Sequence, residues 1–552
     1  MKNKKEILII VILILIQSII YVFVGANKSY LHIDEAYSYG LTNYDKVEIE
    51  ENADFYNTWH NKEYYEDYLT VNEDEIGDLK PVYENQKNDV HPPLYYLLLR
   101  IAMSFSVGSF SKWAGFGLNI VIYAFITILA YLILKKMLSN EKHFEVKAAI
   151  LAFASSIVLS SISNVIYIRM YSLLTLEILI TIYLHIKLLE NEKINLKLLI
   201  GIGITALAGV LTHYYYLFFL VFLYLVLLCK YIKEKRTREL GYYTLTLVTA
   251  GIISLIIFPY SISHMFFGYR GQGVISSLEE ISKILPKIFA EIHVLNYYAF
   301  NNLLYVIIGS ILILWVYLKI RKMEMPKFSQ KEKNILKIIA IPTICFFAIT
   351  SIASPWQVLR YIVPVCGLIF IMVIYYLYKL LHAVFSEKIG NTIVAILLVI
   401  ILISPFVFKL QPELWYKDKK EFVEKMSEEL NLPTIYVYSS QTLGFLNDIL
   451  LFSKIDESYI AKDLDCTEEN IQEIFENKDI SKGIIVVISD NLDKNNIIET
   501  IKDAENFSTF EEVQRLWCSN VYYVHWNFTK IIDKFDFWHY NRDVVSIKNT
   551  TS

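Results

Sequence analysis

The 552-residue chain has only five cysteines, and none of them is spaced like a metal ligand. It contains no glycine-rich phosphate-binding loop in its C-terminal part, where Gly444 and Gly483 stand alone, and it shows no internal repeat. Its net charge of -4 gives no support for nucleic-acid binding. The sequence therefore argues against a structural metal site, a P-loop, a repeat array and a nucleic-acid-binding protein.

The cysteines fall into two groups by their surroundings. Cys229, Cys345 and Cys366 lie in or beside apolar runs, so they are predicted to be small buried hydrophobic residues. Cys466 and Cys518 lie in the C-terminal part, where they either form a disulfide, if that part is extracytoplasmic, or remain separate thiols.

Long apolar runs are the main feature of residues 1–410. Hydrophobic residues make up 55% of the whole chain, and its mean hydropathy is +0.39. Because about 20 apolar residues cross a hydrocarbon core of roughly 30 Å, these runs predict membrane-spanning helices. Eleven are expected, centred near residues 15, 124, 156, 180, 205, 221, 250, 311, 344, 369 and 399. The first run is too long for a cleaved signal peptide, which predicts an uncleaved signal anchor.

Basic residues cluster in every second connection between these runs. They precede the first run and recur in the connections near residues 135–147, 187–197, 230–238, 319–333 and 379–388. The positive-inside rule places these connections and the N-terminus of this multi-pass cell-membrane protein in the cytoplasm. The extracytoplasmic side then receives an acidic loop, residues 26–112, and the C-terminal part.

The C-terminal part, residues 411–552, is predicted to be a small extracytoplasmic α/β domain. Apolar segments at 434–438 and 483–488 predict buried strands, and a further strand pair is expected around 513–526. Helical patterns occur near 443–453 and 493–503. Residues 1–410 form the predicted transmembrane domain, including the first loop with its juxtamembrane helices.

Two adjacent carboxylates, Asp34 and Glu35, follow the first apolar run closely. A charged group near the low dielectric of a membrane needs a cation or a hydrogen-bond partner, or its pKa shifts. The pair is therefore a candidate catalytic site at the membrane surface. A solvated turn beyond the first helix is the alternative.

The other end of the same loop carries the segment HPPLYYLLLR, residues 91–100. The two prolines favour an extended entry followed at once by a helix. Residues 94–105 are too few to span and too apolar to be solvated, so this helix is predicted to lie in the interface plane. His91 and Tyr95 are candidate substrate-binding residues; a helix-capping or water-facing histidine is the alternative for His91.

Three arginines fall on the side that the positive-inside rule normally depletes. Arg169 and Arg360 lie at predicted external helix ends, and Arg270 lies in an external loop. A snorkelling side chain is the alternative for any one of them, but a guanidinium also binds phosphate in a bidentate way and keeps its charge. The external helix ends carry three further candidates for substrate binding: His213, Tyr214 and Tyr361.

Carboxylates and arginines on one membrane surface fit the transfer of a sugar from a lipid phosphate. The arginines would stabilise the leaving phosphate as its charge grows, and a carboxylate would deprotonate the acceptor hydroxyl as general base. Phosphate is a good leaving group, so no general acid is required. The extracytoplasmic side lacks nucleotide sugars, which favours a lipid-borne donor.

These residues resemble the GT-C superfamily of integral membrane glycosyltransferases, in particular the protein O-mannosyltransferase and aminoarabinose-transferase-like branch (glycosyltransferase family 39). The resemblance covers about residues 1–410. It rests on the segments DE at 34–35, HPPLYY at 91–96, RMY at 169–171, THY at 212–214 and RY at 360–361 with Pro364.

The resemblance implies an inverting transferase that uses a polyprenyl-phosphate sugar, with Asp34 as catalytic base and Glu35 beside it. By position, it assigns the lipid phosphate to Arg270 and Arg360, and also to Arg169. Related oligosaccharyltransferases use a divalent cation, whereas this branch is thought to work without one. A divalent cation therefore stays open, and no metal ligand is assigned.

The resemblance leaves the acceptor open, and two other functions compete with sugar transfer. The first loop is longer and more acidic than in many members, and the C-terminal part matches no recognised acceptor-binding module, so the acceptor can be a glycan, a lipid or a protein. A transporter or flippase of a lipid-linked glycan is disfavoured, because the ionisable residues lie at helix ends on one side and no repeat is present. A sensor would leave Asp34 and Glu35 unexplained. The transferase interpretation requires this pair and the arginines to share one outward-facing pocket.

Overall fold

The computed structural model describes residues 4–43, 55–191, 195–429, 431–438, 445–462, 467–516 and 519–526. The chain divides into two compact units. The first comprises Met1–Lys28, Ser38–Val47 and Thr70–Trp415, and the second comprises Ser29–Tyr37, Glu48–Leu69 and Tyr416–Ser552. Parts of the predicted first loop thus belong to the same unit as the C-terminal residues.

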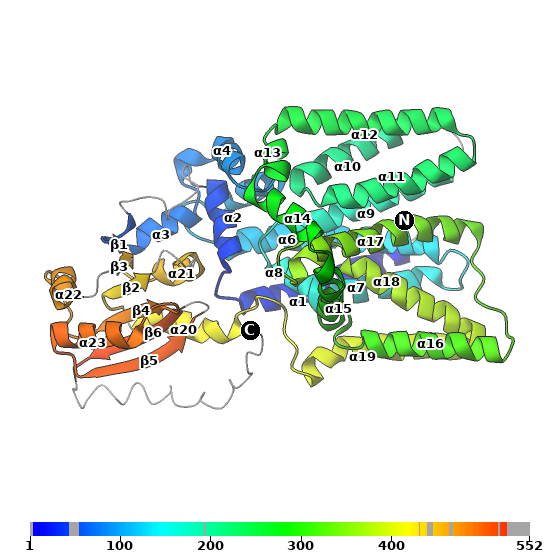
Figure 1. The fold of residues 1–552 in the computed structure, drawn as a ribbon. Helices are drawn as coiled ribbons and strands as arrows, with labels where there is room; N and C mark the ends of the chain where they lie inside the picture. The colour runs from blue at the N-terminus through cyan, green and yellow to red at the C-terminus, as the bar shows by residue number, and fades with distance from the viewer. Residues whose placement is uncertain are drawn as a thin grey trace. The chain divides into compact units, whose positions relative to one another are not determined.

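The first unit is helical (Figure 1). Its described helices are α1 (Lys4–Ala26), α4 (Lys80–Asn88), α5 (Leu94–Met103), α6 (Lys112–Met137), α7 (Phe144–Ile157), α8 (Leu159–Ile166), α9 (Tyr171–Glu190), α10 (Leu196–Thr212), α11 (Tyr216–Lys233), α12 (Thr237–Ile257), α13 (Ser261–Phe266), α14 (Tyr269–Glu279), α15 (Ile284–Phe300), α16 (Leu304–Ile320), α17 (Gln330–Ala353), α18 (Leu359–Val384) and α19 (Glu387–Val407). Short 3-10 turns lie at Glu73–Glu75 and Ile281–Lys283. Helix α2 (Ile33–Asn43) is divided between the two units.

The predicted polytopic architecture is confirmed by the length and composition of these helices. Among the described residues, eight helices are long and apolar enough to cross a membrane, and the bent pairs α7–α8 and α15–α16 raise the number to ten if each is one span. Helix α10, which the sequence predicts as a further span, has 17 residues. Each of the eleven predicted centres falls within one of the helices.

The basic connections meet at one end of the helical unit, called the basic end below. Lys135 of α6 pairs with Glu6 of α1 at 2.5 Å, and Lys379 of α18 bridges Glu141 at 2.7 Å and Glu332 at 2.8 Å. Further ion pairs at this end are Lys136–Glu190, Lys331–Glu190, Lys142–Glu387 and Lys147–Glu387. These contacts join segments far apart in the sequence, so the alternation predicted from charge corresponds to a real grouping of loops.

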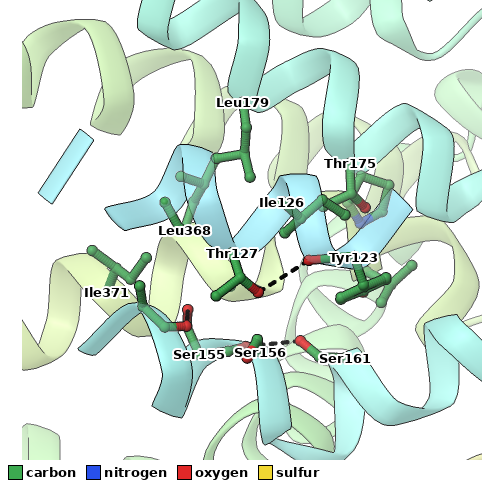
Figure 2. A pocket seen from close by; sticks show the side chains of 15 residues that line it. Tyr123, Ile126, Thr127, Ser155, Ser156, Ser161, Thr175, Leu179, Leu368 and Ile371 are labelled. Atoms are coloured by element: carbon green, nitrogen blue, oxygen red, sulfur yellow. Dashed lines mark hydrogen bonds between the residues drawn. The ribbon is translucent and has the colours of Figure 1, made fainter. Parts of the chain in front are cut away.

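Helices α7 and α8 are separated by a bend of 57°. A cavity of about 30 Å³ lies beside the break, lined by residues of α6, α7, α8, α9 and α18 (Figure 2). The Ser161 hydroxyl donates to the Ser155 carbonyl at 2.8 Å, and the Thr127 hydroxyl donates to the Tyr123 carbonyl at 3.0 Å. The Ser161 hydroxyl thus supplies a hydrogen bond at the break between α7 and α8, where a membrane interior offers no water to the backbone.

The second unit is built on a mixed sheet, which has the strand order β1-β3-β2-β4-β6-β5 in the described residues. Its elements are β1 (Trp59–Asn61), α3 (Lys62–Leu69), a 3-10 turn at Lys417–Lys419, α20 (Lys420–Glu429), β2 (Thr434–Tyr438), α21 (Phe445–Phe452), β3 (Glu457–Lys462), α22 (Glu468–Phe475), β4 (Ile484–Ser489), α23 (Lys494–Glu505), β5 (Thr509–Arg515) and β6 (Ser519–His525). Strand β2 runs parallel to β3 and β4, and the other neighbours are antiparallel.

The two central strands are completely buried because helices cover both faces of the sheet. Helices α22 and α23 contribute Phe475 and Ile501 to a core with Val486 of β4. On β2, Tyr436 packs against Phe452 of α21, with ring centroids 5.5 Å apart. Parallel strands covered on both sides have continuous apolar sequences, which is why β2 and β4 were predictable. The predicted helices α21 and α23 and the strand pair β5–β6 are confirmed as well.

The cysteine predictions have mixed outcomes. Cys366 is buried as predicted and Cys345 is partly buried, but Cys229 is exposed. The prediction for Cys229 was wrong because its side chain faces outward from α11, where apolar surroundings would come from lipid rather than from protein. Cys466 and Cys518 lie outside the described residues.

Candidate functional site

The carboxylate pair lies in the first turn of α2, not in a solvated turn. The backbone N–H of His32 donates to the Glu35 carboxylate at 2.9 Å, and the Glu35 side chain is buried. The Asp34 carboxylate lies 3.6 Å from His32 Nδ1, and its side chain is 22% exposed. Glu35 therefore caps the helix, whereas Asp34 keeps part of its surface accessible. The positive end of the helix dipole favours negative charge at both positions.

The start of α2 is anchored on α21 within the second unit. The backbone N–H of Ile33 donates to Asn447 Oδ1 at 2.8 Å. The Tyr30 hydroxyl donates to the Asp448 carboxyl group, which also accepts a hydrogen bond from Ser519 at 2.9 Å. Asp448 is fully buried, and this burial raises its pKa to about 8 against the opposing effect of Ser519. The C-terminal residues thus fix the position of the helix that carries the carboxylate pair.

In the helical unit, Arg270 and Arg360 both lie against the ring of Trp356. The guanidinium carbons are 5.2 Å and 5.7 Å from the ring centroid, respectively. Arg360 also lies 5.2 Å from the ring of Tyr361 and donates from Nη1 to the Tyr167 hydroxyl at 3.2 Å. Cation–π contacts orient a guanidinium while leaving its charge intact.

Arg360 lies at the N-terminus of α18, where backbone N–H groups point outward. Glu413, from the segment after α19, accepts a hydrogen bond there from the Leu359 N–H. Its own backbone N–H donates to Ser163 Oγ at 2.8 Å, which holds this segment on α8. Burial raises the pKa of Glu413 to about 7, although the Arg360 charge and the Leu359 N–H oppose the increase. A helix N-terminus beside a guanidinium is an arrangement that favours a negatively charged group, here the Glu413 carboxyl group.

Arg169 lies in a second charged group, between α8 and α9. Its guanidinium carbon is 5.8 Å from the ring centroid of Tyr96, and the side chain is buried. Nearby, His91 Nδ1 lies 2.9 Å from Asp89 Oδ2, and the His91 and His213 rings are 6.0 Å apart. Burial opposes the ionisation of Asp89, but the charge and hydrogen bond of His91 and the charge of Arg169 outweigh it, so the pKa of Asp89 is lowered. Burial, assisted by the charges of His91 and Arg169, lowers the pKa of His213 well below its usual value.

A run of aromatic rings connects the two charged groups. The His213 ring lies 5.6 Å from that of Tyr171 and 4.8 Å from that of Tyr215, and the Tyr215 ring lies 6.2 Å from that of Tyr361. Burial raises the pKa of Tyr215 to about 12, so its hydroxyl is neutral at physiological pH. The two groups and these rings form one continuous cluster of mostly buried side chains, called the arginine end below.

The arginine end lies at the opposite ends of helices that reach the basic end. Helix α9 begins with Tyr171 at the arginine end and finishes at Glu190 in the basic end. Helix α18 has Arg360 in its first turn and Lys379 in the ion-pair network. In each helix the two named residues are nineteen positions apart. This separation corresponds to roughly 28 Å along the helix, which is about the thickness of a hydrocarbon core.

Two predicted substrate-binding tyrosines make firm contacts within the fold. Tyr95 is completely buried, and its hydroxyl donates to Asn119 of α6 at 3.2 Å. The Tyr214 hydroxyl lies 2.9 Å from His264 Nδ1, and His264 Nε2 lies 3.1 Å from the Lys87 carbonyl oxygen. Both tyrosines position α5, α10 and α13 around the arginine end, and a substrate contact for either stays a prediction.

The structure thus brings together six of the residues predicted from sequence: Arg169, Arg270, Arg360, His91, His213 and Tyr361. Sequence reasoning missed Asp89 and Glu413. The position of Asp89, two residues before His91, was a usable signal, whereas nothing in the sequence linked Glu413 to Arg360.

Asp34 and Glu35 belong to the other unit, so a pocket shared with the arginines stays a prediction. Among the described residues, no group of three or more His, Cys, Asp or Glu side chains is arranged to hold a metal ion.

The chain is similar in structure to two solved transferases. ArnT from Cupriavidus metallidurans bound to undecaprenyl phosphate has 11% sequence identity and a TM-score of 0.45, with 93% of this chain and 97% of that chain covered. The archaeal oligosaccharyltransferase AglB from Archaeoglobus fulgidus, in complex with an inhibitory peptide and a dolichol-phosphate, has 11% identity and a TM-score of 0.43, with 93% and 73% covered. No protein-family model matches the chain, and no curated protein sequence matches it.

Proposed function

We propose that this protein is a membrane glycosyltransferase that moves a sugar from a polyprenyl-phosphate donor to an extracytoplasmic acceptor hydroxyl, with inversion at the anomeric carbon. The observation that carries the proposal is the arginine end, where Arg270 and Arg360 flank a helix N-terminus opposite the basic end. The positive-inside rule assigns the basic end to the cytoplasm, so the arginine end faces the extracytoplasmic headgroups.

Arg270 and Arg360 are assigned to the donor phosphate. Their contacts with Trp356 orient the guanidinium groups, and the first turn of α18 adds backbone N–H groups and the positive end of its dipole. A phosphate held there gains charge as the glycosidic bond breaks, and preorganised donors stabilise that charge. Arg169 provides a further cation at the same end, beside the Asp89–His91 pair. His91, His213 and Tyr361 are the proposed contacts for the rest of the substrate.

Asp34 is assigned the role of general base. It takes the proton of the acceptor hydroxyl while the hydroxyl oxygen attacks the anomeric carbon and the polyprenyl phosphate leaves with the bonding electron pair. Its position in the first turn of α2 places it near the positive end of the helix dipole. Glu35 supports this arrangement by capping the helix at His32.

Substitution of Asp34 by Asn tests this role. With the general base removed, sugar transfer should fall by a factor of about 10²–10⁴, while expression and donor-lipid binding stay near wild type. The assay uses the full chain reconstituted with a set of polyprenyl-phosphate sugars and a cell-envelope extract as acceptor source. Asp74→Asn, in an exposed part of the same loop, is the matched control and should retain full activity.

Two outcomes would contradict the proposal in different ways. Normal turnover by Asp34→Asn would remove this residue from the mechanism while leaving transferase activity established. Movement of the donor lipid across the bilayer without formation of a new glycosidic bond would identify a flippase.

A further inference from the structure

A large groove lies far from the arginine end, between α11 and α17 at the basic end. Its volume is about 660 Å³, which is within the range of ligand sites. The walls are apolar, with Phe222 and Leu225 from α11 and Ile338 and Ile341 from α17. Its position separates it from every residue assigned to sugar transfer.

The groove has the depth of one membrane leaflet. One wall runs from Phe222 to Lys233 in α11, and the other from Gln330 to Ile341 in α17. Each covers eleven helical steps, or roughly 16 Å at 1.5 Å per residue. A hydrocarbon core is about 30 Å thick, so one leaflet contributes roughly 15 Å. The two walls therefore match the length of acyl chains that enter from the basic end.

Lysines outnumber carboxylates among the side chains that line the groove. Lys230 and Lys233, in the last turn of α11, line its basic end together with a single carboxylate, Glu234, which pairs with Lys230. Lys337 lines the groove further along α17, one turn before Ile341. Three cations against one anion leave a net charge of +2 among these residues. Lysines at headgroup depth attract anionic lipids, whereas a zwitterionic headgroup gains little from such a rim.

We propose that this groove is a binding site for an anionic diacyl phospholipid of the leaflet at the basic end, with its acyl chains between α11 and α17 and its phosphate at the lysine rim. The site is independent of the proposed sugar transfer. Because α11 begins beside Tyr215 and α17 ends three residues before Trp356, a lipid here stabilises the packing of helices next to the proposed active site.

Cys229 provides a natural reporter, because it lines the groove and its side chain is exposed. The experiment uses the full chain in nanodiscs of dioleoyl-phosphatidylcholine with or without dioleoyl-phosphatidylglycerol. Alkylation at Cys229 by N-ethylmaleimide is measured by peptide mass spectrometry, and retained lipids are counted by native mass spectrometry. Phosphatidylglycerol should slow alkylation and be retained in preference to phosphatidylcholine.

The charge contribution is tested with Lys233→Gln combined with Lys337→Gln. At about 1 kcal/mol for each lysine near the surface, affinity for phosphatidylglycerol should fall roughly tenfold or more, with phosphatidylcholine unaffected. The matched control, Lys319→Gln with Lys322→Gln, removes the same charge from exposed positions outside the groove and should change affinity less than about twofold. Leu225→Trp, which fills the groove, should reduce retention of phosphatidylglycerol while leaving the lysines in place.

Three outcomes would overturn the proposal. Equal retention of both lipids would show that the rim does not select charge. Protection of Cys229 by glycerol 3-phosphate alone would identify an anion site without acyl chains. Protection only in dimers seen by native mass spectrometry would assign the groove to a second copy of the chain.

Discussion

The two ends of the helical unit hold their cations in different ways. At the basic end, lysines are paired with carboxylates, as in the bridge from Lys379 to Glu141 and Glu332. At the arginine end, Arg270 and Arg360 lie against the ring of Trp356. The charge of Arg360 also acts on the buried carboxyl group of Glu413. An ion pair joins helices, and a cation–π contact orients a guanidinium against an aromatic ring. We therefore expect substitutions at the basic end to affect mainly stability and substitutions at the arginine end to affect mainly donor binding.

The largest expected effect is on stability, from Lys379→Met at the basic end. The side chain is 11% exposed and pairs with two carboxylates, so its removal leaves buried negative charge without its partner. The free energy of unfolding should fall by about 3–5 kcal/mol, measured by denaturant titration in detergent. Lys322→Met, at an exposed position nearby, should change it by less than about 0.5 kcal/mol. If Lys379→Met and Lys322→Met were equally stable, the ion pairs of Lys379 would not stabilise the fold.

The next effect is on donor binding, from Arg360→Ala. Loss of charge-assisted hydrogen bonds to the lipid phosphate should weaken binding roughly tenfold to 100-fold, measured by competition with polyprenyl phosphate. Arg360→Lys, which retains charge without a bidentate fork, should fall between wild type and Arg360→Ala. Arg321→Ala, at the basic end, should bind normally. A similar loss in both alanine variants would mean that the two ends do not differ in function.

A smaller effect is expected from Trp356→Leu, because the ring contacts both arginines that are proposed to bind the donor. Loss of two cation–π contacts should raise the KM for the donor about fivefold with little change in kcat. Trp315→Leu is the matched control, since the Trp315 ring lies 5.5 Å from Lys319 in the other half of the unit. An unchanged KM in Trp356→Leu would show that the arginines are oriented by other contacts.

The smallest effect concerns pH, through Glu413. With a pKa raised to about 7 by burial, this carboxyl group is neutral below pH 7 and an anion above it. The anion competes with phosphate for Arg360, so donor affinity should fall a few-fold between about pH 6 and pH 8. Glu413→Gln should flatten this decrease, and Glu387→Gln at the basic end should not. The quantity to compare is the change in donor affinity between pH 6 and pH 8, measured for Glu413→Gln and for the wild type.

Sequence reasoning succeeded where one physical rule acts on a continuous segment. In a bilayer the backbone must satisfy its own hydrogen bonds, so an apolar run long enough to span becomes a helix. The eleven predicted centres follow from this rule. The buried strands β2 and β4 follow from continuous apolar composition, because residues on both of their faces contact helices. The prediction that the basic connections lie on one side likewise depends only on which loops carry lysine and arginine.

Sequence reasoning failed where two distant segments had to meet. Strand β1, from the first loop, pairs with β3 about 400 residues later, in the register Trp59 to Tyr459. Three-residue strands carry too weak a local pattern to be recognised. The contact of Asn447 with the start of α2 and the approach of Glu413 to Arg360 are of the same kind. Each depends on a side chain meeting a backbone group that only packing brings near.

The sequence by itself determined the helical spans and the two central strands, because hydropathy is a property of a segment in its solvent. It also proposed three arginines as phosphate-binding candidates, because they lie on the side opposite the basic connections. Only the tertiary structure decided that Arg270 and Arg360 share one tryptophan, that Glu35 caps its helix while Asp34 keeps part of its surface exposed, and that a carboxyl group after the last span approaches the N-terminus of α18. These features depend on distances between groups, which the chain acquires only when its helices and strands pack.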